Sequence, residues 1–194
     1  MEPAEKKSGN NDTPLRTLRE RCLAIDWLIV DVDGVLTDGG ITYADNRREL
    51  KQFHVRDGSG LKIWQYLGKK SALITGRSSP VVDVRAAEVG IETVFQGATD
   101  KMPAYRQLLQ AHGLRPEQVC YVGDDVPDLP VMWHCGLAVA VADACPDVLA
   151  AAHHVTRAAG GRGAVRETLE MILRCQGLWG KLIERYRNEK LTER

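Results

Sequence analysis

The stretch LIVDVDGVLTDGG, residues 28–40, decides the fold, because it joins an apolar run to a cluster of carboxylates. Asp31, Asp33 and Asp38 fall within eight positions of one another here. Carboxylates repel one another and resist burial, so a buried strand that ends in several of them needs a compensating charge. We therefore expect a cation at this end of the strand.

Strand-like and helix-like segments alternate along the rest of the chain. Runs of strand length occupy residues 25–33, 70–75, 91–97, 118–125 and 137–144, and the most apolar of them are typical of parallel strands covered on both faces. Helical patterns occupy residues 14–24, 57–68, 81–90, 100–113, 126–136, 145–155 and 164–187. This alternation predicts an α/β fold built on a doubly wound parallel sheet.

The composition is typical of one globular domain. The chain has 194 residues, and its 44% apolar and 27% charged residues are ordinary for a soluble protein with a sizeable core. The formal net charge is zero, so we expect neither a nucleic acid nor an anionic membrane as a partner. No run resembles a membrane span or a secretory signal, which predicts a cytosolic location. We expect a disordered tail at 1–13, the domain at 14–188 and a flexible C-terminus at 189–194.

Carboxylates follow two of the predicted strands. Asp31 and Asp33 lie two residues apart, so on an extended segment their side chains face the same side. Asp124 and Asp125 end a second strand, and Asp128 lies four residues beyond Asp124. Ligands of doubly wound sheets bind at the carboxyl ends of the strands. Because oxygen ligands without histidine or cysteine suit Mg²⁺, we expect a magnesium site there.

A second set of residues suits a phosphate group. Thr75 and Gly76 end another predicted strand and offer a hydroxyl and a backbone N–H, and Lys101 lies early in a predicted helix. Each signal is weak alone, because aspartates at strand ends often cap helices and single lysines are usually solvated. Together they favour phosphoryl transfer, in which one aspartate attacks phosphorus and another protonates the leaving alcohol. The residues alone do not say which aspartate has which role.

Four motifs resemble those of the haloacid dehalogenase superfamily, phosphatase branch: DVDGVLTDG (31–39), LITGR (73–77), Lys101 and GDDVPD (123–128). Further segments, among them FHVRDGSGLK (53–62) and GGRGAVRE (160–167), resemble the 3-deoxy-D-manno-octulosonate 8-phosphate phosphatases. The resemblance runs from about residue 25 to residue 180. It implies a Mg²⁺-dependent phosphatase that acts through an aspartyl phosphate.

The resemblance also implies a role for each carboxylate. Asp31 would be the nucleophile and a Mg²⁺ ligand, and Asp124 would complete the metal site. Asp33 would be the general acid and base and would bind the metal through its backbone carbonyl. Asp125 and Asp128 would be supporting carboxylates.

For the substrate, the resemblance implies that Thr75, Gly76 and Lys101 hold the phosphate. A sugar-acid phosphate is anionic at both ends, so arginines are expected near the site. Arg77 is our first candidate, because it directly follows Thr75 and Gly76. Three more arginines lie near the expected loops and suit surface or salt-bridge roles equally well, namely Arg56, Arg85 and Arg166.

The segment between Asp33 and Thr75 is too short for a separate cap domain, so we expect a capless fold with a β-hairpin at residues 39–55. In the resembled family such hairpins associate in a homotetramer, which we therefore predict. An unpaired hairpin edge would also be a liability in a monomer.

Two alternatives remain open from the sequence. One is a phosphatase for a nine-carbon substrate, a sialic-acid or 2-keto-3-deoxynonulosonic-acid 9-phosphate, which shares the phosphate and the α-keto acid. The other is a non-catalytic scaffolding module that keeps the fold. The complete catalytic set speaks against the second alternative.

Overall fold

The computed structural model describes residues 16–192 and the side chains of residues 16–188. The tail predicted at residues 1–13 lies outside the described residues, as do residues 193 and 194. Helix α8 continues through residues 189–192. The flexibility expected of the C-terminus stays a prediction.

The described residues form a six-stranded sheet with the order β5-β4-β1-β6-β7-β8, in which every neighbouring pair is parallel. The strands are β1 (Trp27–Val30), β4 (Lys70–Ile74), β5 (Thr93–Phe95), β6 (Val119–Gly123), β7 (Leu137–Ala140) and β8 (His154–Val155). Every residue of β1, β6 and β7 is buried, because helices cover both faces of the sheet. The predicted doubly wound parallel sheet is confirmed.

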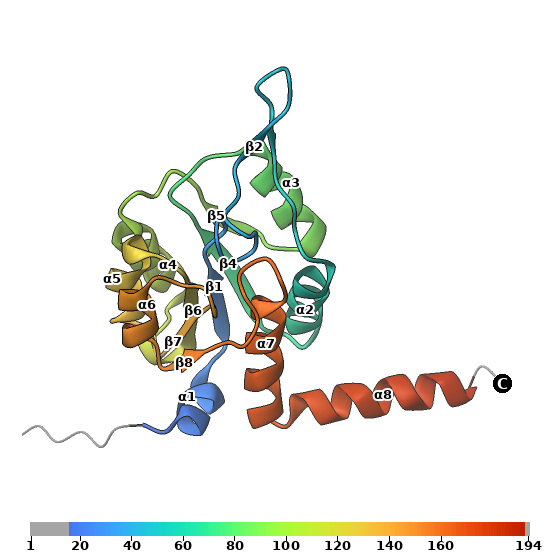
Figure 1. The fold of residues 1–194 in the computed structure, drawn as a ribbon. Helices are drawn as coiled ribbons and strands as arrows, with labels where there is room; N and C mark the ends of the chain where they lie inside the picture. The colour runs from blue at the N-terminus through green and yellow to red at the C-terminus, as the bar shows by residue number, and fades with distance from the viewer. Residues whose placement is uncertain (1–15, 193–194) are drawn as a thin grey trace, which may run out of the picture.

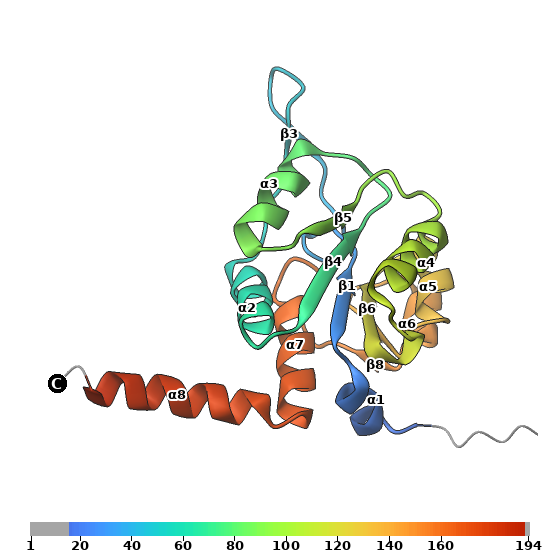
Figure 2. The same ribbon diagram turned by 180° about the vertical axis from the view of Figure 1, so that it is seen from behind.

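Helices α4, α5 and α6 cover one face of the sheet, and α2, α3 and α7 lie on the other side (Figures 1 and 2). The helices are α1 (Leu18–Ala24), α2 (Val55–Tyr66), α3 (Pro80–Val89), α4 (Lys101–His112), α5 (Leu129–Met132), α6 (Pro146–Ala151), α7 (Ala164–Cys175) and α8 (Leu178–Thr192), with short 3₁₀ helices η1 (Pro116–Gln118) and η2 (Val126–Asp128). Large side chains such as Trp64, Leu28 and Leu108 fill the core between these layers.

The prediction of one long final helix over residues 164–187 is wrong. Helix α7 ends at Cys175, and Gly177 adopts a φ of 70°, which an L-residue with a side chain rarely adopts. The Gln176 amide also donates to the carbonyls of Cys22 and Ile25, both at 2.8 Å. The chain therefore turns, and α8 projects from the body as an arm (Figure 1).

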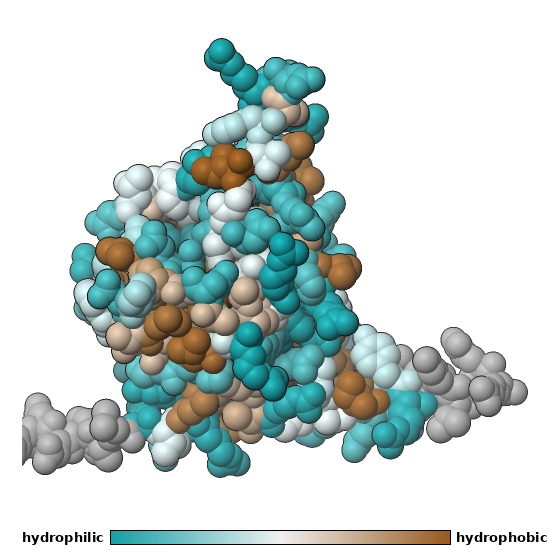
Figure 3. Space-filling view, viewed as in Figure 1, coloured by the Kyte–Doolittle hydropathy of each residue, from teal (hydrophilic) through white to brown (hydrophobic). Residues whose placement is uncertain are grey.

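A hairpin projects from the opposite end of the molecule (Figures 1 and 2). It consists of β2 (Thr42–Tyr43) and β3 (Glu49–Leu50), which pair antiparallel. Figure 3 shows a hydrophilic tip and apolar side chains near the base of this hairpin. Between Asp33 and the start of β4 the described chain forms only this hairpin and α2, so it carries no separate cap. None of the described helices is both long and apolar enough to cross a bilayer.

Candidate active site

The pairing of β1 with β6 brings the two predicted carboxylate loops together. Val30 lies opposite Val122, and the backbone N–H of Asp31 donates to the Val122 carbonyl at 3.1 Å. One carboxylate oxygen from each of Asp31, Asp124 and Asp128 lies within 4.8 Å of the others. The carboxyl ends of two neighbouring parallel strands thus place three acids at one point, as the sequence predicted for the first two.

Gly34 makes this approach possible. Its φ of 95° lies in the left-handed region, and a Cβ at this position would lie 2.0 Å from Oδ2 of Asp124. Any side chain here would both strain the backbone and displace a carboxylate. The glycine that follows the DVD triplet therefore lets the second loop pack against the first.

Lys101 provides the cation among these acids. It is the first residue of α4, whose N-cap is Asp100, and its side chain is buried. Its Nζ donates to Asp31 Oδ1 at 2.7 Å and to Asp128 Oδ1 at 2.5 Å. We refer to Asp31, Lys101, Asp124 and Asp128 as the inner cluster. It holds three carboxylates against one ammonium.

Asp128 organises the inner cluster rather than facing an open space. Its Oδ1 accepts from Lys101 and from the Tyr121 hydroxyl at 2.6 Å. Its Oδ2 accepts from the backbone N–H groups of Asp124 at 2.9 Å and Asp125 at 3.2 Å. Because these four donors occupy both oxygens, Asp128 fixes the loop that carries Asp124.

Burial and crowding disfavour ionisation of the other two acids. Burial raises the pKa of Asp31 to about 6, with Lys101 opposing that rise and Asp128 adding to it. Burial, together with the nearby charges of Asp31 and Asp128, raises the pKa of Asp124 to about 8. Oδ1 of Asp124 is buried without a hydrogen-bond partner among the described residues. An orphaned carboxylate oxygen beside other oxygen ligands, with excess negative charge, fits a divalent cation such as Mg²⁺.

The predicted phosphate-binding residues lie at the same edge of the sheet. Strand β4 pairs with β1, and Thr75 follows β4 as Asp31 follows β1. The buried Thr75 is held by its backbone, which donates to the Phe95 carbonyl at 2.9 Å and accepts from Ala98 at 3.0 Å. The backbone N–H of Gly76 has no partner among the described residues and remains available to a ligand. These two residues thus offer donors next to the inner cluster.

Asp33 does not join the inner cluster through its side chain. Its Oδ1 accepts a hydrogen bond from Nζ of Lys51, and Nε of Arg77 lies 3.5 Å from its Oδ2. Glu49 Oε1 accepts from Arg77 at 2.7 Å and lies 3.4 Å from Lys51 Nζ. We refer to Asp33, Glu49, Lys51 and Arg77 as the outer cluster.

The sequence reasoning missed Glu49 and Lys51. Glu49 begins β3 and Lys51 directly follows that strand, and residues two apart on an extended segment face the same side. That spacing was a usable signal, but only the folded hairpin shows that this face meets the loop of Asp33. Both residues belong to the surroundings of the predicted general acid.

Two other predicted residues have partners elsewhere. Asp125 lies outside the three-carboxylate group and accepts from the backbone N–H of Val126 at 2.8 Å, which caps η2. Arg166 donates to Glu170 at 2.7 Å, and its guanidinium lies 5.0 Å from the ring centroid of Trp179. These contacts support structural roles within one chain.

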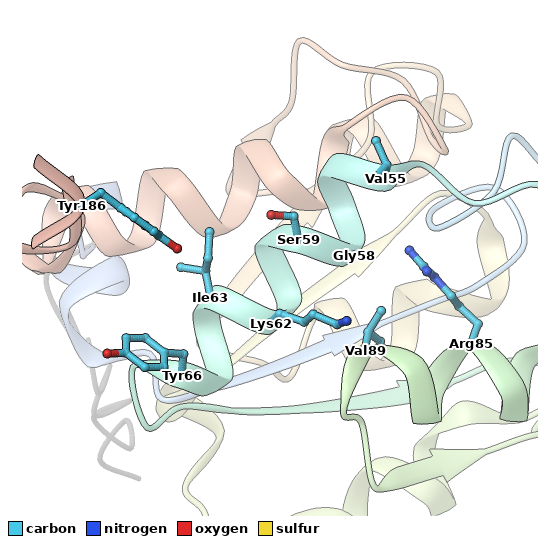
Figure 4. A pocket seen from close by; sticks show the side chains of 9 residues that line it. All are labelled: Val55, Gly58, Ser59, Lys62, Ile63, Tyr66, Arg85, Val89 and Tyr186. Carbon is cyan, nitrogen blue, oxygen red and sulfur yellow. The ribbon is translucent and has the colours of Figure 1, made fainter. Parts of the chain in front are cut away.

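Arg85 and Arg56 lie in separate pockets. Arg85 and Lys62 both extend into a pocket of about 390 Å³ between α2, α3 and α8 (Figure 4). The Arg85 guanidinium also lies 5.3 Å from the ring centroid of Phe53. Arg56 lines a second pocket of about 780 Å³, together with residues of α7. No member of the inner cluster lines either pocket, so a substrate contact by these arginines stays a prediction.

Comparison with known proteins gives relatives that match most of the chain. A family model described as haloacid dehalogenase-like hydrolase matches residues 83–167. The chain is 48% identical over 157 residues to the 3-deoxy-D-manno-octulosonate 8-phosphate phosphatase of Yersinia pestis. The aligned residues make up 81% of this chain and 84% of the relative. Its counterpart from Escherichia coli K12 is 49% identical over 153 residues, covering 79% of this chain and 81% of the relative.

Solved structures show the same relationship. The crystal structure of the Yersinia pestis phosphatase has a TM-score of 0.81 at 48% identity, covering 82% of this chain and 86% of that chain. The Moraxella catarrhalis phosphatase, solved in complex with a magnesium ion, a phosphate ion and a KDO molecule, has a TM-score of 0.85 at 38% identity. It covers 87% of this chain and 97% of that chain.

Proposed function

Because the chain belongs to the 3-deoxy-D-manno-octulosonate 8-phosphate phosphatase family of the haloacid dehalogenase superfamily, we propose that it hydrolyses 3-deoxy-D-manno-octulosonate (KDO) 8-phosphate to KDO and inorganic phosphate. One observation carries this proposal: a chain of this family keeps Asp31, Lys101 and Asp124 together in the inner cluster. A scaffolding module would not need a buried excess of negative charge.

The metal site of this proposal contains Asp31 and Asp124, through their carboxylates, and Asp33, through its backbone carbonyl. Support comes from the three-carboxylate group and from the unpartnered Oδ1 of Asp124. Bound Mg²⁺ would neutralise the acids and stabilise the negative charge of the phosphoryl group during transfer. Asp128 remains bound to its four donors and keeps Asp124 in place.

The chain's own residues then carry the chemistry. An oxygen of Asp31 attacks phosphorus and forms an aspartyl phosphate, while Asp33 gives a proton to the departing sugar oxygen. In the second step Asp33 takes a proton from water, whose oxygen attacks the same phosphorus and releases phosphate and free Asp31. Thr75, Gly76 and Lys101 donate hydrogen bonds to the phosphoryl oxygens throughout. Only these donors and the carboxylates need to be placed, since phosphoryl transfer depends mainly on positioning and charge.

Arg77 is the substrate-binding residue of this proposal. Its side chain is 43% exposed, and only part of its guanidinium is engaged by Glu49 and Asp33. Arginine has five N–H donors, so the remaining ones can bind the carboxylate of a sugar acid.

We also propose that the protein is a homotetramer, in which the hairpins of different subunits pack together. Ile41, Tyr43 and Leu50 of the hairpin region are exposed in the single chain. A two-stranded hairpin with short strands is marginal alone and gains from association. Light scattering coupled to size exclusion should give four times the chain mass, and Ile41→Arg should lower it. A cytosolic location is part of the same proposal and is tested by cell fractionation.

The decisive experiment measures phosphate release from a panel of sugar phosphates, with Mg²⁺ and with EDTA. KDO 8-phosphate should give the highest kcat/KM, and EDTA should remove the activity. A clear preference for the nine-carbon 9-phosphates would replace the substrate but keep the reaction. Activity that persists in EDTA would contradict the metal site.

A further inference from the structure

The carboxylate of Asp33 is bound by a buried lysine, which its proposed role as a general acid does not by itself require. Lys51, from the end of the hairpin, donates to Oδ1 of Asp33, and its side chain is only 2% exposed. Oδ2 of the same carboxylate is buried and has no hydrogen-bond partner among the described residues. Nε of Arg77 lies 3.5 Å from this Oδ2, outside hydrogen-bond geometry. One oxygen is therefore fixed by a hydrogen bond, and the other can still accept or donate one.

Neighbouring charges hold Lys51 itself in place. Glu49 Oε1 lies 3.4 Å from Lys51 Nζ and accepts from Arg77 at 2.7 Å. The outer cluster thus contains two cations and two carboxylates. These opposite charges offset the desolvation cost of the buried ammonium, and contacts with two carboxylates hold Lys51 in one orientation.

We propose that Lys51 is a positioning residue: by holding Oδ1 of Asp33, it aims Oδ2 at the oxygen of the leaving sugar alcohol. This inference rests on the proposed phosphatase function and deepens it. Proton transfer needs the acid within hydrogen-bond reach of the reacting oxygen, and a carboxylate held at one oxygen keeps that geometry. Because Lys51 directly follows β3, the place of the hairpin also sets the orientation of Asp33.

The leaving group provides a test that a merely structural role would not pass. A sugar alkoxide leaves poorly unless it is protonated, whereas 2,4-dinitrophenolate leaves without a proton. In Lys51→Met, kcat for KDO 8-phosphate should fall on the order of 10²-fold, the usual contribution of a general acid. The single-turnover burst of dinitrophenolate from 2,4-dinitrophenyl phosphate should stay within about threefold of the wild-type rate, since forming the aspartyl phosphate from it needs no acid.

Three variants make the result specific. Asp33→Asn should show the same split between the two substrates, and adding Lys51→Met to it should lower the rate no further. Lys70→Met, at the opposite end of the sheet on β4, is the matched control and should leave both rates unchanged. Circular dichroism and size exclusion should be measured for each variant, to check that it is folded.

The inference would be overturned by an equal fall for both substrates in Lys51→Met, or by full additivity with Asp33→Asn. Unchanged hydrolysis of KDO 8-phosphate by folded Lys51→Met would also overturn it. A wild-type protein that releases phosphate from no sugar phosphate would instead contradict the proposed function, so the two failures are distinguishable.

Discussion

The inner and outer clusters are built from similar groups but differ in charge balance. The inner cluster sets three carboxylates against the ammonium of Lys101, and the pKa values of Asp31 and Asp124 rise to about 6 and about 8. The outer cluster sets Asp33 and Glu49 against two cations. An excess of negative charge in a cluster therefore indicates a site for a further cation. Equal numbers of carboxylates and cations indicate a group that is held in one orientation.

Replacing the nucleophile should have the largest effect on activity. Asp31→Asn removes the attacking oxygen while keeping the size of the side chain, so phosphate release should fall on the order of 10⁴-fold or more. The same variant relieves the excess negative charge of the inner cluster. In EDTA its Tm should therefore equal or exceed that of the wild type, as measured by scanning calorimetry.

The change in Tm on adding Mg²⁺ provides the control for this variant. The wild type should gain Tm with Mg²⁺, and Asp31→Asn should lose most of that gain, because one ligand is missing. Activity within tenfold of the wild type would rule out the covalent mechanism. If Asp31→Asn in EDTA has a Tm many degrees below that of the wild type, the inner cluster carries no destabilising excess of negative charge.

Removing a lysine from each cluster compares the two directly. Lys101→Met leaves three carboxylates, two of them buried, without a cation and should lower the free energy of unfolding in EDTA by about 3 kcal/mol. Lys51→Met leaves Arg77 beside Asp33 and should cost about half as much. Mg²⁺ should recover much of the first loss and little of the second, as measured by urea unfolding. An equal response of both variants to Mg²⁺ would contradict the distinction between the clusters.

The pH dependence of the metal-free protein should reflect the inner cluster. Asp31 and Asp124 have folded-state pKa values of about 6 and about 8, above the unfolded value of 3.8, so the folded state binds their protons more tightly. Stability from this pair is therefore present at low pH and is lost as the pH rises through 6 and 8. The charged and titratable groups that surround this pair are Lys101, Asp128 and Tyr121.

Thermal unfolding between pH 5 and 9 provides the measurement. In EDTA the Tm should fall across this range, and Asp124→Asn should flatten the fall. Mg²⁺ binds to ionised carboxylates, so the increase in Tm that saturating Mg²⁺ produces should grow as the pH rises. A metal-free Tm that rises between pH 6 and 8 would contradict the raised pKa values.

The inner cluster was largely predictable from the sequence, and the reason is topological. Apolar strands that end in Asp31 and Asp124 imply a parallel sheet, and the carboxyl ends of parallel strands meet at one edge. The motif around Lys101 then supplied the cation. Side-chain detail was less accessible: that Asp128 joins the cluster while Asp125 caps η2 depends on how one tight turn folds.

The outer cluster was not predictable in the same way. Glu49 and Lys51 reach Asp33 from a hairpin whose position depends on packing and not on strand order. Similar reasoning explains the wrong prediction for the last helix. The apolar pattern continues through residues 164–187, but Gly177 and the contacts of Gln176 end α7, and these contacts involve α1, far away in sequence.

Replacing Arg77 should have the smallest effect on activity. The result shows whether the exposed side of the outer cluster binds the substrate. If it binds the carboxylate of the sugar acid, Arg77→Gln should raise KM for KDO 8-phosphate about tenfold, the value of one charged hydrogen bond, and leave kcat within twofold. Dinitrophenyl phosphate has no carboxylate, so its KM should not change. Arg106→Gln, an exposed position on α4, is the matched control. A fall in kcat for KDO 8-phosphate without a change in KM would instead group Arg77 with Lys51, because holding Asp33 affects proton transfer and not binding. The outer cluster would then serve the acid alone, and the substrate carboxylate would have to be bound by arginines outside it.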